Sequence, residues 1–112
     1  MPAYHFERES RTPQSETLII VDGDREFGRV DLHFARDMVH ATLCVPENVS
    51  EDDIQDLIAE IDERLVMPVE PFRDDFIVTV WLGRQAGVYS EDMEEELLDE
   101  EMNGDGHREE RA

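Results

Sequence analysis

The sequence predicts an α+β fold in which one helix packs on one face of a mixed four-stranded sheet. Three observations lead to this prediction. Residues 16–45 contain three short apolar runs of β-branched or alternating character, residues 51–65 carry apolar side chains at helical spacing, and residues 75–82 form a further apolar run. The expected order of elements is therefore β-β-β-α-β.

The first three strands are expected within residues 16–45. Residues 16–21 are a short β-branched run that stops at the turn-forming residues 22–24. Residues 28–35 alternate between apolar and polar side chains, as a half-buried strand does. A second alternating run covers residues 38–45, and Pro46 ends it.

The turn between the second and third strands fixes which residues face each other. With Arg36 and Asp37 as a two-residue turn, His33 lies opposite His40. This register places the apolar side chains of both strands on one face, which agrees with their alternation. The other predicted pairs are Ala35 with Met38, Phe34 with Val39, Leu32 with Ala41, Asp31 with Thr42 and Arg29 with Cys44.

A helix is predicted to begin after Ser50, whose hydroxyl can accept a hydrogen bond from the amide of Asp53. The acidic residues 51–53 suit the positive end of the helix dipole. One apolar stripe must lie on the sheet, and the helix must stop before Pro68. The stripe consists of Ile54, Leu57, Ile58, Ile61 and Leu65.

Residues 75–82 form the strongest predicted strand, which Gly83 closes. Two hairpins make the strand at 38–45 parallel to the strand at 16–21. A helical crossover then most simply brings residues 75–82 beside residues 16–21, and residues 38–45 become an edge of the sheet.

Charge restricts the partners of the chain. All ten basic residues are arginine and thirty residues are Asp or Glu, so the formal charge is −20 over 112 residues. The arginines are scattered singly and form no basic patch, so direct binding to nucleic acid or to a membrane surface is not expected. A GC-rich genome or adaptation to high salt also produces such acidity, so charge alone names no partner.

Composition divides the chain into a polar N-terminal arm at residues 1–15, one α+β domain at 16–90 and an acidic tail at 91–112. The tail holds eleven acids against two arginines, a local charge of −9. Ser90 can cap a short second helix that carries Met93, Leu97 and Leu98. The tail residues expected to engage a basic surface are Glu94, Glu95, Glu96, Asp99, Glu100 and Glu101.

The setting of the protein is expected to be the cytoplasm. Cys44 is the single cysteine, which excludes an intrachain disulfide. The first ten residues lack the apolar run that a signal peptide or a membrane span needs.

The predicted hairpin suggests one candidate metal site. If His33 faces His40, the two imidazoles can approach a common ion, with Asp31 two residues along the same strand face. Two histidines and a carboxylate suit zinc, or iron where coordination positions stay open. A shift of one residue in the register would separate the pair.

The same strand face also has a structural explanation. One helix covers one face of a sheet, so the other face needs a partner or a further cover. Aromatic residues and methionine are enriched at interface cores, and a symmetric homodimer is the simplest arrangement. The residues 93, 97 and 98 of the tail are an alternative cover. The predicted interface residues are Met38, His40, Thr42, Ile77 and Trp81.

No catalytic motif is evident, so no catalytic residue is predicted. The sequence favours a small acidic protein-interaction or regulatory accessory protein whose tail engages a basic protein surface. The first alternative is a metal-binding protein or metal-dependent enzyme that uses His33, His40 and Asp31. The second is a DNA mimic that inhibits a nucleic-acid-binding protein, which needs carboxylates spaced like phosphates.

Overall fold

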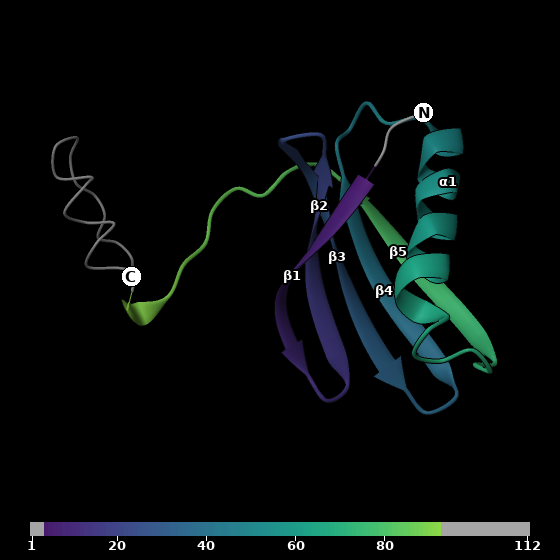
Figure 1. The fold of residues 1–112 in the computed structure, drawn as a ribbon. Coiled ribbons are helices and arrows are strands. Elements are labelled where there is room, and N and C mark those ends of the chain that lie inside the picture. The colour runs from purple at the N-terminus through teal and green to yellow at the C-terminus, as the bar shows by residue number, and fades with distance from the viewer. Residues whose placement is uncertain (1–3, 93–112) are drawn as a thin grey trace, which may run out of the picture.

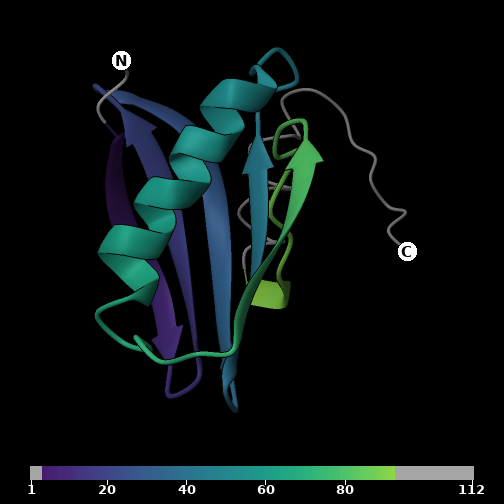
Figure 2. The ribbon, with the colours of Figure 1, turned by 90° about the vertical axis from the view of Figure 1, so that its right-hand side faces the viewer.

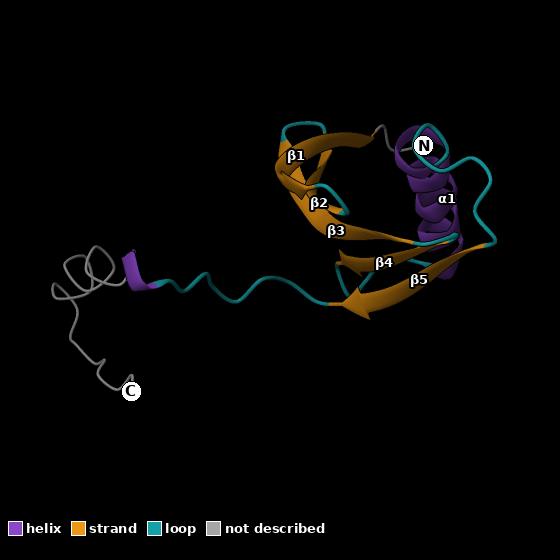
Figure 3. Ribbon diagram, turned by 90° about the horizontal axis from the view of Figure 1, so that it is seen from below, coloured by secondary structure: helices purple, strands orange, loops and turns teal. Residues whose placement is uncertain are grey.

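A curved sheet of five strands carries one helix on its concave side (Figure 1, Figure 3). The structure is a computed structural model that describes residues 4–92. The strands lie side by side in sequence order. Their bounds are β1 Tyr4–Thr12, β2 Ser15–Asp22, β3 Arg25–Ala35, β4 Met38–Val45 and β5 Asp75–Leu82, and the helix α1 covers Glu51–Ile61.

The predicted hairpin between β3 and β4 is confirmed at every pair, including His33 opposite His40. Asp37 takes a positive φ of 61° in its turn, a conformation that aspartate tolerates better than most residues. Gly23 takes a φ of 72° in the turn between β2 and β3, where glycine has no steric cost. Local turn chemistry therefore fixes the β2–β3 and β3–β4 hairpins.

The predicted helix is also confirmed, with one addition at its end. The Ser50 hydroxyl accepts a hydrogen bond from the Asp53 N–H at 3.1 Å, as the capping pattern predicts. Beyond Ile61 the chain continues through a π-helical turn, η1, over Asp62–Val66. Its Met67 N–H donates to the Asp62 carbonyl at 2.8 Å, and the helical path ends before Pro68.

The expected count of four strands is wrong, because part of the predicted N-terminal arm forms β1. This strand pairs antiparallel with β2 and has a bulge between Arg8 and Ser10. Only Tyr4 and Phe6 supply apolar side chains, so alternation in the sequence is too short to indicate a strand. The α+β class itself is confirmed.

Contacts from the helical segment hold β1 in place. The Nη1 atom of Arg64 donates to the Tyr4 carbonyl at 2.9 Å, and its guanidinium lies 4.8 Å from the centre of the Phe6 ring. The Tyr4 ring packs on Phe27 with ring centres 5.2 Å apart. These contacts join residues that are far apart in the sequence, so a local pattern cannot reveal them.

The predicted position of the last strand is wrong. β5 pairs in parallel with β4 and does not lie beside β2. The edge of β2 that the prediction assigned to it is occupied by β1, so the free edge of β4 receives β5 instead. Residues 38–45 are consequently an inner strand.

The core lies between α1 and the middle of the sheet. Alternation in β4 buries one face of that strand, and the helix contributes Leu57 and Ile61. Within residues 4–92, no helix has the length and apolar character needed to cross a membrane. The buried apolar residues are Tyr4, Leu18, Ile20, Val30, Leu32, Val39, Ala41, Leu43, Val45, Leu57, Ile61 and Val66.

The predicted acidic tail lies almost wholly outside the described residues. After β5, residues 84–90 run away from the sheet without regular structure, and residues 91 and 92 are helical (Figure 1). The predicted helix residues Met93, Leu97 and Leu98 and the six predicted contact acids between 94 and 101 are not described.

Candidate interaction surface

The face of the sheet opposite α1 is called the open face here, and it carries the predicted interface residues. On β4 the side chains of Val39, Ala41, Leu43 and Val45 point to the helix and are buried. Alternation therefore directs Met38, His40, Thr42 and Cys44 to the other side. The parallel register places Ile77, Thr79 and Trp81 of β5 on that same side.

The open face is organised in rows that run across the strands. One row contains Ile19, Arg29, Cys44 and Trp81, taken from β2 to β5. The next contains Thr17, Asp31, Thr42 and Thr79, and the third contains Ser15, His33, His40 and Ile77. Two apolar side chains of β5 thus flank a row of small polar ones.

The largest apolar side chain of this face is exposed. Trp81 is 61% exposed and Ile77 is 38% exposed, whereas Met38 and Cys44 are half-buried. Burial of a tryptophan removes a large apolar area from water, so an exposed indole on a formed strand is unfavourable. All five predicted interface residues lie on one continuous face. The exposed apolar side chains among them, Ile77 and Trp81, both belong to β5.

The arrangement of α1 explains why β5 is so poorly covered. The helix crosses the earlier strands, and β5 stands to one side of it (Figure 2). Even the side chains of β5 that point to the helix face, Phe76, Val78 and Val80, are only half-buried, and Leu82 is 54% exposed. β5 therefore lacks a full layer of contacts on both of its faces.

The two histidines of the candidate metal site lie opposite each other, as predicted, and both are exposed. The carboxylate of Asp31 is engaged elsewhere, because its Oδ1 atom accepts from Arg29 Nη2 at 3.3 Å. Across residues 4–92, no group of three or more His, Cys, Asp and Glu side chains is arranged to hold a metal ion. The hairpin thus supplies a pair of imidazoles, and the metal site stays a prediction.

An open groove continues the Trp81 row at the end of β4 and β5. Arg29, Cys44, Gly83, Arg84 and Val88 are among the residues that line it. The Cys44 thiol lies 3.9 Å from the Gly83 carbonyl oxygen, its hydrogen-bond acceptor. This groove joins the sheet to the segment that follows β5, so its two walls come from distant parts of the sequence.

Arg29, which lines this groove, has a buried side-chain donor without an acceptor. Its Nη2 atom contacts Asp31 and lies 3.8 Å from Glu9 Oε1, whereas its Nε atom is buried and has no hydrogen-bond partner. A buried donor without an acceptor is unfavourable in a free protein. Sequence reasoning placed Arg29 opposite Cys44 but gave it no role, because neither its burial nor the groove follows from the hairpin pattern.

Comparison of the chain with protein-family models, with curated proteins and with solved structures finds no match.

Proposed function

We propose that this protein is a small cytoplasmic protein-interaction or regulatory accessory protein that binds its partner on the open face beside β5. The exposure of Trp81 is the observation that carries the proposal. Its side chain is 61% exposed on a well-formed strand, on the face that α1 leaves uncovered. Tryptophan is among the residues most enriched in the energetic centres of protein interfaces.

The surroundings of Trp81 define the chemistry of the partner. Ile77 offers a second apolar contact, and the threonines between them admit close approach of another chain. The matching partner surface therefore presents apolar side chains to Trp81 and Ile77.

The acidic tail supports a partner with a basic surface. Residues 91–112 carry a local charge of −9, close along the chain to the groove and to β5. Charge of this kind accelerates association and makes it dependent on ionic strength, whereas the apolar contact sets most of the lifetime. Tail and open face accordingly have separate roles in the proposal.

Capture of partners from cells that make the protein tests the role of the open face. Trp81→Ala should abolish capture of a protein that the unaltered chain retains. Phe72→Ala is the matched control, because Phe72 is also an exposed aromatic residue but lies in the crossover before β5, outside the strands that form the open face. Equal capture by the two variants would rule out the open face as the binding site.

Deletion of residues 91–112 tests the role of the tail. The shortened chain should bind the same partner more slowly at low salt, and its affinity should change little when salt is raised. The full chain should lose affinity as salt rises, because screening acts on its attraction to a basic surface. Capture that is equally strong and equally insensitive to salt in both chains would refute the tail's role.

A further inference from the structure

We propose that two copies of the chain join through their β5 strands, antiparallel and centred on Thr79, so that their sheets form one continuous sheet. The inference goes beyond the proposed function, because it concerns a second copy of this chain that pairs with the edge of the sheet. The open faces of both copies then lie on the same side.

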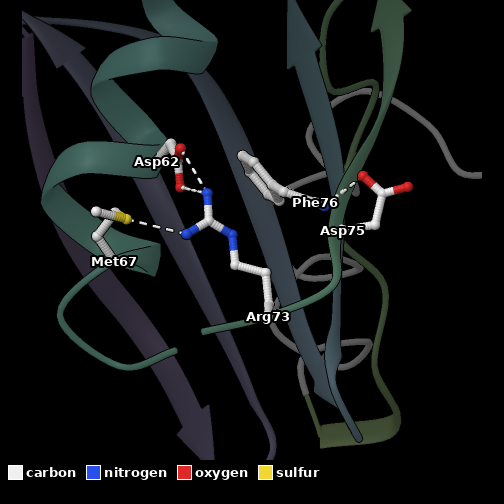
Figure 4. A network of polar contacts seen from close by, with 5 residues as sticks. All are labelled: Asp62, Met67, Arg73, Asp75 and Phe76. Carbon is white, nitrogen blue, oxygen red and sulfur yellow. Dashed lines mark hydrogen bonds and ion pairs between the residues drawn. The ribbon is translucent and has the colours of Figure 1, made fainter. Parts of the chain in front are cut away.

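The backbone of β5 has its free hydrogen-bonding groups on the edge away from β4. The Gly83 N–H donates to the Val45 carbonyl of β4 at 2.8 Å. Because these groups alternate along a strand, the N–H and C=O of Val78 and Val80 point to the opposite edge. The Phe76 N–H belongs to this outward set, and it donates to its neighbour's carboxylate, Asp75 Oδ1, at 2.8 Å (Figure 4).

The two edges of the sheet differ in how they are protected. β1 carries charged side chains and a bulge between Arg8 and Ser10, both of which oppose pairing with another chain. β5 has no charged residue, glycine or proline from Phe76 to Leu82. An apolar edge strand of this length is a template for a further strand. Among the described residues, no strand pairs with the edge of β5 that faces away from β4.

The β5 sequence is complementary to itself when two copies pair around Thr79. Val78 then lies opposite Val80 of the second copy on the helix side. On the open face, Ile77 lies opposite Trp81 of the second copy. Cross-strand pairs of β-branched and aromatic residues are the stabilising unit of an antiparallel sheet. The pairing therefore covers side chains that the single chain leaves exposed or half-buried on both faces.

Charge complementarity selects this register and this partner. Asp74 and Arg84 are each five positions from Thr79. Asp74 of one copy therefore approaches Arg84 of the other copy at each end of the paired strands. Both residues are exposed, and neither forms an ion pair with another described residue. A centre at residue 78 would instead place Asp75 opposite Trp81, and a centre at residue 80 would place Arg84 opposite Phe76.

Disulfide formation at the symmetry axis tests the register. Thr79 faces itself in a pair whose α-carbons are about 4.5 Å apart, a separation that a disulfide accepts. In a Cys44→Ala background, Thr79→Cys should give a covalent dimer under mild oxidation. Ile77→Cys is the matched control, because its two copies would be about 14 Å apart. Equal cross-linking of the two variants would refute the register.

Sedimentation of the purified chain tests the dimer itself, at about 0.15 M salt, where charges more than about 8 Å apart are largely screened but charges in contact are not. Thr79→Arg should weaken the dimer by about tenfold or more, because like charges then meet at the axis. Thr42→Arg, the exposed neighbour in the same row on β4, should leave it unchanged. A chain that stays monomeric at every concentration would overturn the proposal, even if a foreign strand later proved to bind β5.

Exchange of charges tests the ends of the interface. Asp74→Arg alone should weaken the dimer, and the double variant Asp74→Arg with Arg84→Asp should restore it. Restoration distinguishes a direct contact between copies from a general effect of net charge, since the double variant has the net charge of the original chain. Failure to restore would refute the assigned contact. Loss of the dimer leaves partner capture through the open face testable with the Asp74→Arg chain, because Asp74 precedes β5 and is not part of the open face.

Discussion

Arg73 and Asp62 form a close ion pair that ties the crossover to the end of the helical segment. The Nη2 atom of Arg73 lies 2.7 Å from each carboxylate oxygen of Asp62, and its Nη1 atom contacts the Met67 sulfur at 2.9 Å (Figure 4). The Arg73 side chain is 15% exposed, so solvent screens the pair only in part. Because Arg73 lies two residues before Asp75, the first residue of β5, this contact sets where the strand begins.

Replacement of Arg73 by alanine should therefore lower the free energy of unfolding by about 1.5–3 kcal/mol, as expected for hydrogen bonds to a charged group. Urea denaturation at neutral pH measures this change. Glu60→Gln is the matched control, because Glu60 pairs with Arg64 at 3.3 Å on the helix surface and contributes about 0.5 kcal/mol or less. An equal decrease in the free energy of unfolding of both variants would show that the Arg73–Asp62 contact stabilises the fold no more than a surface ion pair.

Gly28 should not tolerate a side chain. A β-carbon at this position would overlap the carbonyl oxygen of Cys44 on the neighbouring strand. Gly28→Ala should cost about 1–3 kcal/mol, since two backbones must move apart. Gly87→Ala is the control, because its added methyl would meet only the Tyr89 side chain. Thermal unfolding of both variants would decide, and an unchanged midpoint for Gly28→Ala would contradict the close approach.

Stability should fall at alkaline pH because of Tyr4. Burial, followed by the nearby carboxylates of Asp22, Asp53 and Glu60, raises the pKa of the Tyr4 phenol above its usual 10.0. The folded chain therefore holds this proton more tightly than the unfolded chain. The contribution of the Tyr4 phenol to the free energy of unfolding is complete below the pKa of the unfolded chain. It is lost as the pH rises through the pKa of the folded chain. Urea unfolding between about pH 9 and about pH 11 measures the loss.

Tyr4→Phe should reduce this alkaline loss, because the packing of the ring on Phe27 remains while the ionisable group is removed. The same alkaline slope in both chains would assign the effect to other groups.

The pair of His33 and His40 should bind zinc only weakly. Two exposed imidazoles face each other, but a third ligand is missing among the described residues and Asp31 is held by Arg29. Stable zinc sites use three or four protein ligands. Elemental analysis after gel filtration without chelator should give well under one zinc per chain. One equivalent that is retained by the original chain and lost in His33→Ala would instead establish the metal site.

The parts of the fold that local chemistry determines could be predicted from the sequence. The alternation of β3 and β4 with the short turn at Asp37 gave the full register, and Ser50 marked the start of α1. β1 could not be predicted, since Arg64 stabilises it from a distant segment. The position of β5 depends on which edge of the sheet β1 leaves free. Missing β1 therefore led to the wrong placement of β5 beside β2.

The candidate surface was predicted only in part for the same reason. Which residues share the open face follows from alternation, and the five predicted interface residues do share it. How much each is exposed depends on where α1 lies over the sheet, which no sequence period encodes. Arg29 and the groove involve three segments brought together by the whole fold.

The single parallel pairing of β5 has a consequence for the order in which the chain assembles. β1 to β4 are joined by short turns, so they can form one after another from neighbouring residues. β5 must wait until the helix and its crossover have closed a much longer loop. The strand that carries Trp81 is therefore expected to dock last and to open first, which leaves it the most adaptable part of the sheet.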